Sequence, residues 1–301
     1  MSHVYKYLKK SQKMRTKILV DVFVFLLGYF FTVSVQAQRP PAELELIPIN
    51  DSIYVIHNQG VPGNATALIT DEGVLLVDDK FEADYENMVE LLRSVTDQPV
   101  RYVVNTHYHQ DHSGSNARFK AAGADIVMTA QARERMVEVN QSGLPRFTME
   151  ESARIHIGGE VVDLLYFGRA HTGGDLVVYF PDYQILVAGD LFNYGAIFGD
   201  GPQAAQLVDY AGGGSVREWT KTLDAILMLG FETVVPGHGI VTTKTEMRRF
   251  RDSTLELRSR IQGMLRQGNS REAIEQVLRG EFGWQDLHMM RGFDGILGEL
   301  R

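Results

Sequence analysis

A short polar segment of the chain contains four possible metal ligands within six positions. His107, His109, Asp111 and His112 form the pattern H-x-H-x-D-H, directly after an apolar run that ends at Val104. In an extended or looping backbone, the first two histidines project to the same side. Imidazole and carboxylate are the ligands that Zn²⁺ accepts where thiolate is unavailable, and the chain has no cysteine. The pattern therefore predicts a metal site, against the alternative of a solvated polar loop.

Three further candidates share one local setting. They are His171, Asp190 and His238. Each of them follows an apolar, strand-like run and has a glycine nearby in the sequence. Glycine lets the backbone turn sharply and approach a site closely. Because α/β folds place function in the loops at strand ends, we expect these three residues to meet the first four in one place.

Hydrophobic periodicity and turn signals indicate the elements that must position these residues. In the first half, strands are expected at 43–49, 52–57, 65–70, 74–78, 100–104 and 126–128, and helices at 81–95 and 116–122. In the second half, strands are expected at 161–167, 176–180, 185–188 and 233–235, and helices at 217–229, 245–266 and 271–279. Strands grouped with helices in two successive halves favour two sheets packed together with helices outside.

The other histidines and two large apolar residues are interpreted as structural. A lone histidine is more often a polar residue of the surface or core than a ligand, which applies to His57, His156 and His288. Trp219 and Met228 occupy core-like positions in an expected helix, so packing is the interpretation for both.

Three aspartates near the expected site are open to two interpretations. Asp78 and Asp79 end a strand, and Asp175 follows the turn of His171. These carboxylates could orient the imidazoles that bind metal. The alternative is that they cap turns.

Charge is unevenly distributed along the chain. The formal net charge is -8, but residues 1–37 hold six Lys/Arg against one acid, Asp21. Removing this net +5 leaves -13 for the remainder. A body that acidic is a poor candidate for nucleic-acid binding, which needs a basic face.

The first 37 residues have the pattern of a signal peptide. Positive residues precede an apolar run from Ile18 to Val35, and Val35-Gln36-Ala37 matches a small-residue cleavage site. We therefore expect a periplasmic or secreted protein. An uncleaved membrane anchor is the alternative, because an apolar run of this length nearly spans a bilayer. The extension before Met14 is long for a leader, so translation from Met14 is a second possible start.

The complete motif set resembles the metallo-β-lactamase superfamily. The resemblance consists of H-x-H-x-D-H, a lone histidine, an aspartate after a strand and Pro236-Gly237-His238-Gly239, and it runs through residues 44–240. It implies an α/β (α+β) architecture, an αββα sandwich of two mixed β-sheets with helices on both outer faces and the site along one edge. Residues 38–244 would be the catalytic domain, with 245–301 as a helical extension packed on it.

Residue by residue, the resemblance divides the seven candidates between two metals. His107, His109 and His171 bind the first metal; Asp111, His112 and His238 bind the second; Asp190 bridges the two. Zinc is expected at both positions, with iron or manganese as alternatives. Three protein ligands plus a shared hydroxide form the open arrangement of a catalytic zinc. Asp111 and Asp190 are also the catalytic candidates that the resemblance implies.

The implied activity is hydrolysis of an ester, thioester or amide bond, a β-lactam included, by the metal-bridging hydroxide. The expected partner is a small-molecule substrate, and the oligomeric state stays open. Two departures leave the substrate class open too: Asn193 stands where one zinc β-lactamase group has lysine, and Gly173 replaces the proline of His-Thr-Pro-Gly. Residues 58–64 and 193–215 are expected to form the pocket walls.

Two rival functions are weighed against hydrolysis. One branch of the superfamily binds a single iron and oxidises persulfides, but the complete second ligand set favours two metals. A non-catalytic metal-binding or partner-binding module is the other rival, and the intact ligands argue against it. For residues 245–301, plain packing is weighed against a substrate-restricting wall or an oligomer contact.

The leader pattern predicts a mature N-terminus at Gln38. N-terminal sequencing of the protein recovered from its native host measures this directly. An intact leader found in the membrane fraction would contradict cleavage and favour the anchor.

Overall fold

The computed structural model describes residues 39–195 and 205–301. The predicted leader, residues 1–37, and part of the 193–215 segment lie outside the described residues. Residues 41–301 form one compact unit. Among the described residues, no helix is both long and apolar enough to cross a bilayer.

The first sheet has seven strands in the order β1-β2-β3-β4-β5-β6-β7. Strands β1 to β4 pair antiparallel, whereas β4 to β7 pair parallel, so the sheet is mixed. The strands are β1 (Glu45–Pro48), β2 (Ile53–His57), β3 (Ala65–Thr70), β4 (Gly73–Val77), β5 (Val100–Val104), β6 (Asp125–Thr129) and β7 (Phe147–Met149). The apolar runs of β3 and β4 flank the Asp71-Glu72-Gly73 turn, as the sequence predicts.

The second sheet has six strands in the order β13-β12-β11-β10-β9-β8. Its pairs are antiparallel except for β11 with β12, which is parallel, so this sheet is also mixed. The strands are β8 (Ser152–Ile157), β9 (Glu160–Leu165), β10 (Val177–Phe180), β11 (Ile185–Val187), β12 (Thr233–Val235) and β13 (Thr242–Thr243).

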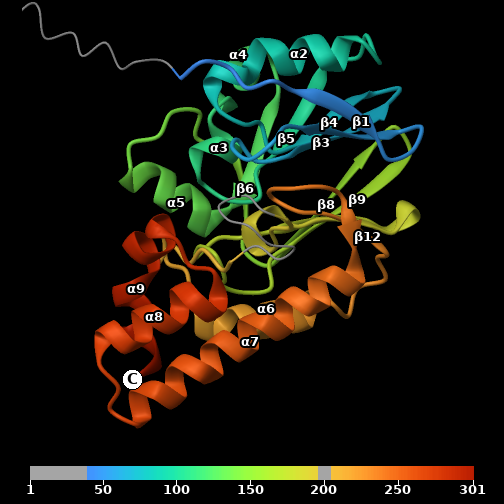
Figure 1. The fold of residues 1–301 in the computed structure, drawn as a ribbon. Coiled ribbons are helices and arrows are strands. Elements are labelled where there is room, and N and C mark those ends of the chain that lie inside the picture. The colour runs from blue at the N-terminus through green and yellow to red at the C-terminus, as the bar shows by residue number, and fades with distance from the viewer. Residues whose placement is uncertain (1–38, 196–204) are drawn as a thin grey trace, which may run out of the picture. The chain divides into compact units, whose positions relative to one another are not determined.

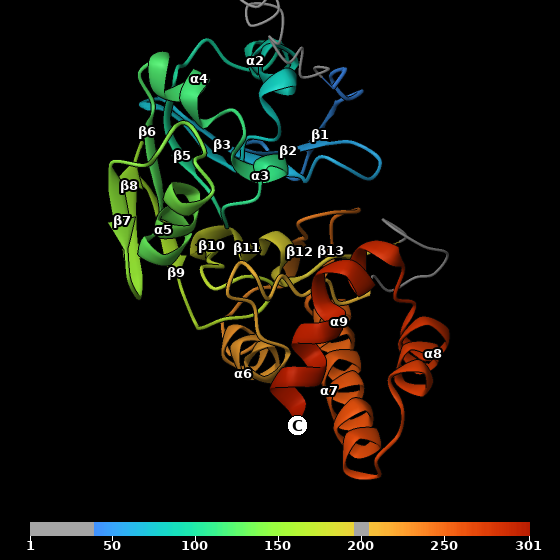
Figure 2. The same cartoon turned by 90° about the vertical axis from the view of Figure 1, so that its left-hand side faces the viewer.

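Helices cover the outer face of each sheet (Figures 1 and 2). On the first sheet these are α2 (Tyr85–Arg93) and α4 (Asn116–Ala121), while α3 (Gln110–Ser113) and α5 (Ala130–Glu138) lie to the side of this layer. On the second sheet they are α6 (Val216–Ile226) and α7 (Lys244–Arg266), with α8 (Arg271–Phe282) and α9 (Asp286–Leu300) packed against these helices. Short 3-10 helices occupy Glu82–Asp84, Pro181–Tyr183 and Gly189–Leu191. The predicted αββα sandwich is confirmed.

The three largest apolar clusters of the described residues hold the layers together. One lies between the sheets and includes Val77 and Val104 from the first and Val178 and Val235 from the second. A second packs α2 and α4 on the first sheet. The third and largest packs α6 to α9 on the second sheet around the buried Trp219. Helix α7 lies within this cluster, so the C-terminal helices share a core with the residues before them.

Some elements differ from the sequence prediction. Helix α9 was not predicted, because Gly292, Gly295 and Gly298 lower helix propensity within it. Helix α5 and strands β7 and β8 were also missed. Met228 was expected in the core, but its side chain is 85% exposed. The reason is that α6 ends at Ile226, so Met228 lies beyond the amphipathic helix.

Packing of α7 on the second sheet predicts a large cost for truncating Leu257, which is fully buried. Leu257→Ala should lower the free energy of unfolding by about 2–5 kcal/mol, since it removes buried methyl groups and leaves a cavity. Met228→Ala is the matched control and should stay within about 0.5 kcal/mol. Urea unfolding of both variants measures this, and equal stabilities would refute the shared core.

Candidate metal centre

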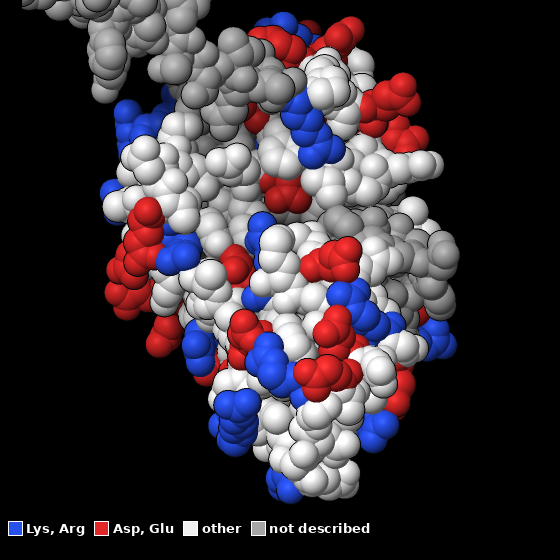
Figure 3. Space-filling view, turned by 60° about the vertical axis from the view of Figure 1, so that its left-hand side comes forward, with Lys and Arg blue, Asp and Glu red and all other residues white. Residues whose placement is uncertain are grey.

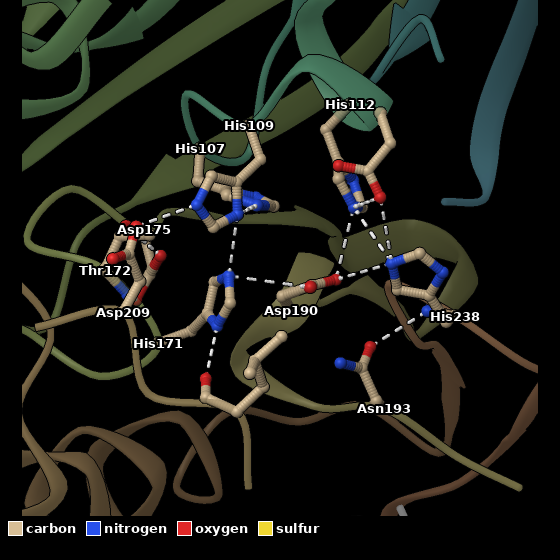
Figure 4. A network of polar contacts seen from close by, with 12 residues as sticks. His107, His109, His112, His171, Thr172, Asp175, Asp190, Asn193, Asp209 and His238 are labelled. Atoms are coloured by element: carbon tan, nitrogen blue, oxygen red, sulfur yellow. Dashed lines mark hydrogen bonds and ion pairs between the residues drawn. The ribbon is translucent and has the colours of Figure 1, made fainter. Parts of the chain in front are cut away.

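The topology of the two sheets brings four loops to one edge. Strand β10 is antiparallel to both β9 and β11, and β11 is parallel to β12, so β9, β11 and β12 run the same way. The loops that follow them carry His171, Asp190 and His238. The loop after β5, in the first sheet, carries the H-x-H-x-D-H segment. In Figure 4 the side chains of the first-sheet loop point toward those of the second-sheet loops.

The first donor set consists of three imidazole nitrogens. His109 Nδ1 lies 3.1 Å from His107 Nε2 and 3.0 Å from His171 Nε2. All three atoms lie within 4.8 Å of one another. Two ligand atoms on a tetrahedral zinc are about 3.3 Å apart, given Zn–N bonds of about 2.0–2.1 Å. The spacing of this set therefore fits one zinc ion.

The second donor set consists of two imidazole nitrogens and one carboxylate oxygen. His112 Nε2 lies 3.3 Å from His238 Nε2. Asp111 Oδ2 lies 3.7 Å from the first of these nitrogens and 3.4 Å from the second. These distances also match the edges of a tetrahedral site.

Asp190 lies between the two sets. Its Oδ1 is 3.2 Å from His112 Nε2 and 3.4 Å from His238 Nε2, while its Oδ2 is 3.6 Å from His171 Nε2. Oδ1 is buried and makes no hydrogen bond with any described residue. A Cβ at position 237 would overlap this oxygen, so only glycine fits there. One oxygen thus faces each set, which is the arrangement of a bridging carboxylate.

The other ring nitrogen of every one of these imidazoles contacts an oxygen. The pairs are His107 Nδ1 with Thr106 Oγ1 (3.1 Å), His109 Nε2 with Asp209 Oδ2 (2.9 Å), His112 Nδ1 with Asp78 Oδ2 (2.8 Å), His171 Nδ1 with Leu207 O (2.5 Å) and His238 Nδ1 with Gly60 O (2.9 Å). An oxygen acceptor holds the proton on the outer nitrogen. The inner nitrogens then direct lone pairs at the centre, where only cations relieve their repulsion.

Burial and neighbouring charges shift the pKa of these groups. Burial lowers the pKa of His107 well below its usual value and lowers that of His171 to about 4. Burial also opposes charge at His112 and His238, but the carboxylates of Asp190 and Asp111 outweigh it and raise both pKa values. Protons therefore bind these two imidazoles more readily than free histidine, and a metal would displace them.

The two candidate carboxylates are ionised near neutral pH. Burial alone would raise the pKa of each. The neighbouring His238 and His112 reverse this effect at Asp190 and lower its pKa well below the usual value. The same histidines lower the pKa of Asp111. Ionised carboxylates and neutral imidazoles are the forms that bind metal.

Asp209 is a residue that sequence reasoning missed. Its Oδ2 accepts hydrogen bonds from His109 Nε2 and from the Tyr108 hydroxyl (2.5 Å), and its Oδ1 accepts one from Gly212 N (3.1 Å). These donors outweigh the effect of burial and lower the pKa of Asp209. No local signal identifies it, since it lies in an irregular segment 100 positions from His109.

Lys80 is a second missed residue, fully buried beneath the site. Its ammonium donates to Asn58 Oδ1 (2.7 Å) and to Gly63 O (2.6 Å). Burial lowers the pKa of Lys80 to about 7 despite the nearby Asp84. These bonds hold the 58–63 loop, whose Gly60 O orients His238.

Of the three uncertain aspartates, only Asp78 reaches a candidate ligand, His112. Asp79 instead accepts a hydrogen bond from Ser115 N at 2.9 Å, and Asp175 accepts one from Thr172 N at 2.8 Å. Both of these carboxylates therefore stabilise turns.

The other three histidines among residues 39–195 and 205–301 lie outside both donor sets. His57 is buried against Asn64 Oδ1 at 3.0 Å, and His156 is exposed in β8. His288 is buried in α9, where its ring accepts from Gln285 N at 3.2 Å. Asn193, at the position of the absent lysine, accepts a hydrogen bond from His238 N at 2.9 Å.

A cavity of about 480 Å³ opens over the donor atoms. Val61 and Leu207 line it, so both predicted wall segments contribute. Helix α9 lines it as well, through Leu287 and Arg291. A group of donors below an open cavity of this size can serve a small-molecule substrate.

The chain is similar in sequence to known proteins. Residues 58–238 match the family model described as the metallo-beta-lactamase superfamily. The metallo-beta-lactamase type 2 of Bacillus cereus is 27% identical over 248 residues, which is 75% of this chain and 93% of that protein. Metallo-beta-lactamase IND-1 of Chryseobacterium indologenes is 26% identical over 200 residues, 64% of this chain and 80% of that protein.

Solved structures agree on the fold. A metallo-beta-lactamase from Pontibacter korlensis has a TM-score of 0.61 at 22% identity, covering 70% of this chain and 99% of that one. The crystal structure of the DIM-1 metallo-beta-lactamase has a TM-score of 0.60 at 18% identity, covering 71% of this chain and 98% of that one.

The carboxylates of Asp209 and Asp78 each orient a histidine of a different set, and this predicts separable effects. Asp209→Asn should weaken metal binding at the first set by about 10–100-fold, because a neutral amide orients His109 less well. Asp78→Asn should weaken the second set similarly through His112, and the first set less, because Asp78 reaches His107 only through the Thr106 hydroxyl. Zinc titration monitored by calorimetry resolves the two steps. Asp182→Asn, at an exposed aspartate, is the control. Equal losses at both sets in both variants would refute the pairing.

Proposed function

The chain belongs to the metallo-β-lactamase superfamily, and we propose that it is a hydrolase that uses two zinc ions. The bond cleaved is an ester, thioester or amide, with β-lactams among the amides. The leader pattern supports action in the periplasm or outside the cell.

The observation that carries this proposal is the pair of three-atom donor sets with Asp190 between them. Seven ligands are too many for one tetrahedral ion, but they suit two ions that share a carboxylate. A single-iron oxidoreductase would need only part of this arrangement. The spacing of the second set, Asp111 with His112 and His238, therefore favours the two-metal hydrolase over that alternative.

When bound, zinc supplies a water nucleophile at neutral pH and polarises the carbonyl group that is attacked. The residues of the chain hold and orient the reacting groups. Asp209 and Asp78 keep the proton of His109 and His112 on the outer ring nitrogen. Lys80 holds the 58–63 loop, whose Gly60 O contacts His238, and Asn193 accepts a hydrogen bond from the backbone of His238. The orientation of the metal-binding atoms is thereby set before the substrate binds. A preorganised site lowers the activation free energy, because its groups need not reorient in the transition state.

The substrate is proposed at the level of bond class. The relatives named above are metallo-beta-lactamases, which supports a β-lactam. Asn193, however, is a neutral and buried side chain, and its Oδ1 accepts a hydrogen bond from His238 N. This position therefore offers no cation to a substrate. Turnover by zinc-loaded protein of a β-lactam, a 4-nitrophenyl ester and an acyl thioester identifies the bond. No turnover of any of them would overturn the proposal.

The place of Asp190 between the sets predicts different outcomes for two isosteric variants. Asp190→Asn removes a charge shared by both sets, so it should weaken both and lower kcat roughly 10²–10³-fold. Asp111→Asn should lower occupancy of the second set and largely spare the first. Zinc content and kcat are measured together for each variant. His156→Ala, at an exposed histidine, is the control and should behave as wild type. Two metals and normal turnover in Asp190→Asn would contradict the bridging role.

A further inference from the structure

Helix α9 places a guanidinium at the donor sets. Arg291 Nη1 lies 3.1 Å from His109 Nε2 and 3.8 Å from Asp209 Oδ2. His109 presents its other nitrogen, Nδ1, to the first donor set. One imidazole ring therefore separates the guanidinium from the position of the first metal. The helix lies beyond the family match, which ends at residue 238.

The contacts of Arg291 do not satisfy its charge. The Nε2 proton of His109 is already directed at Asp209, so two donors face each other across 3.1 Å. Asp209 Oδ2 accepts from His109 and Tyr108 at 2.9 and 2.5 Å, and its contact with Arg291 is longer, at 3.8 Å. A guanidinium has five N–H donors in a planar fork that matches a carboxylate. The side chain is 38% exposed, so an incoming anion can reach these donors.

The position of α9 is set by close packing. A Cβ at Gly295 would overlap the ring of Tyr210, and one at Gly292 would lie 2.9 Å from the ring of Trp284. At the end of the helix, Glu299 accepts hydrogen bonds from the Tyr210 hydroxyl (2.8 Å) and from the Ser215 hydroxyl. Helix α9 is therefore fixed to the same segment that carries Asp209, and Arg291 is held at the cavity.

Arg291 is the basic side chain among the described residues that line the cavity. No other lysine or arginine is found among these lining residues. Its neighbours there are mostly apolar or neutral, such as Leu287, Val139 and Gln141. On the side of the molecule in Figure 3, acidic and basic side chains are interspersed, without a broad area of one charge. Attraction of an anion to the site would thus depend on this residue and on the metals.

We propose that Arg291 is the residue that selects the substrate, by binding a carboxylate a few bonds from the carbonyl group that is attacked. The substrate class is a short acyl compound with a free carboxylate. This inference rests on the proposed function for the reaction itself, but recognition of the carboxylate can be measured without turnover.

The test is binding of two probes, glutarate and butyrate, to the zinc-loaded protein by calorimetry. Each probe has one carboxylate for the metals, and only glutarate has a second for Arg291. Wild type should bind glutarate on the order of 10–100-fold more tightly than butyrate, since a bidentate charged pair is strong. Arg291→Gln should abolish this preference with unchanged zinc content, and Arg291→Lys should restore part of it. Arg260→Gln, at an arginine of similar exposure, should leave it intact.

Turnover gives an independent comparison. For 4-nitrophenyl hemiglutarate against 4-nitrophenyl butyrate, Arg291→Gln should lower kcat/KM on the order of 10–100-fold for the anionic ester alone. A glutarate preference that survives in Arg291→Gln, or is missing in wild type, would overturn the inference. A preference without turnover of either ester would instead count against the proposed hydrolase and uphold the role of Arg291.

Discussion

Five imidazole nitrogens and two carboxylates converge in a space where neighbouring donor atoms are mostly 3.0–3.7 Å apart. Their lone pairs repel one another unless cations lie between them, and this constraint explains the surroundings of the site. Each imidazole must present an unprotonated inner nitrogen, so each outer nitrogen contacts an oxygen such as Asp78, Asp209 or Gly60 O. Without metal, protons on His112 and His238 would balance part of the negative charge of Asp111 and Asp190. The raised pKa values of both histidines favour such protonation.

The same constraint connects the site to distant parts of the chain. Leu207 O orients His171 and Asp209 orients His109, so the 205–217 segment supports the first donor set. That segment is in turn covered by α9, through Glu299 and the close approach of Gly295 to Tyr210. The C-terminal helices thus contribute to the geometry of the metal centre as well as to the core, and they bring Arg291 to the cavity.

The candidate ligands and most strands and helices could be predicted from the sequence, because their signals are local. H-x-H-x-D-H and the glycine-flanked His171, Asp190 and His238 identified the seven candidate ligands, and periodicity identified most strands and helices. The residues that support them could not be predicted this way. Asp209 and Arg291 lie 100 and 182 positions from His109, so their contacts depend on tertiary structure alone. Helix α9 was missed because its glycines argue against a helix, although two of them serve its packing.

The most direct test of the account is the metal content of the intact mature protein, purified with zinc, freed of loose metal by dialysis and measured by elemental analysis. Two donor sets that share Asp190 predict two zinc ions per chain. The two ions should leave in separate steps as a chelator is added, because the sets differ in ligands and in bound protons. One metal per chain at saturating zinc, or one iron without zinc, would contradict the account.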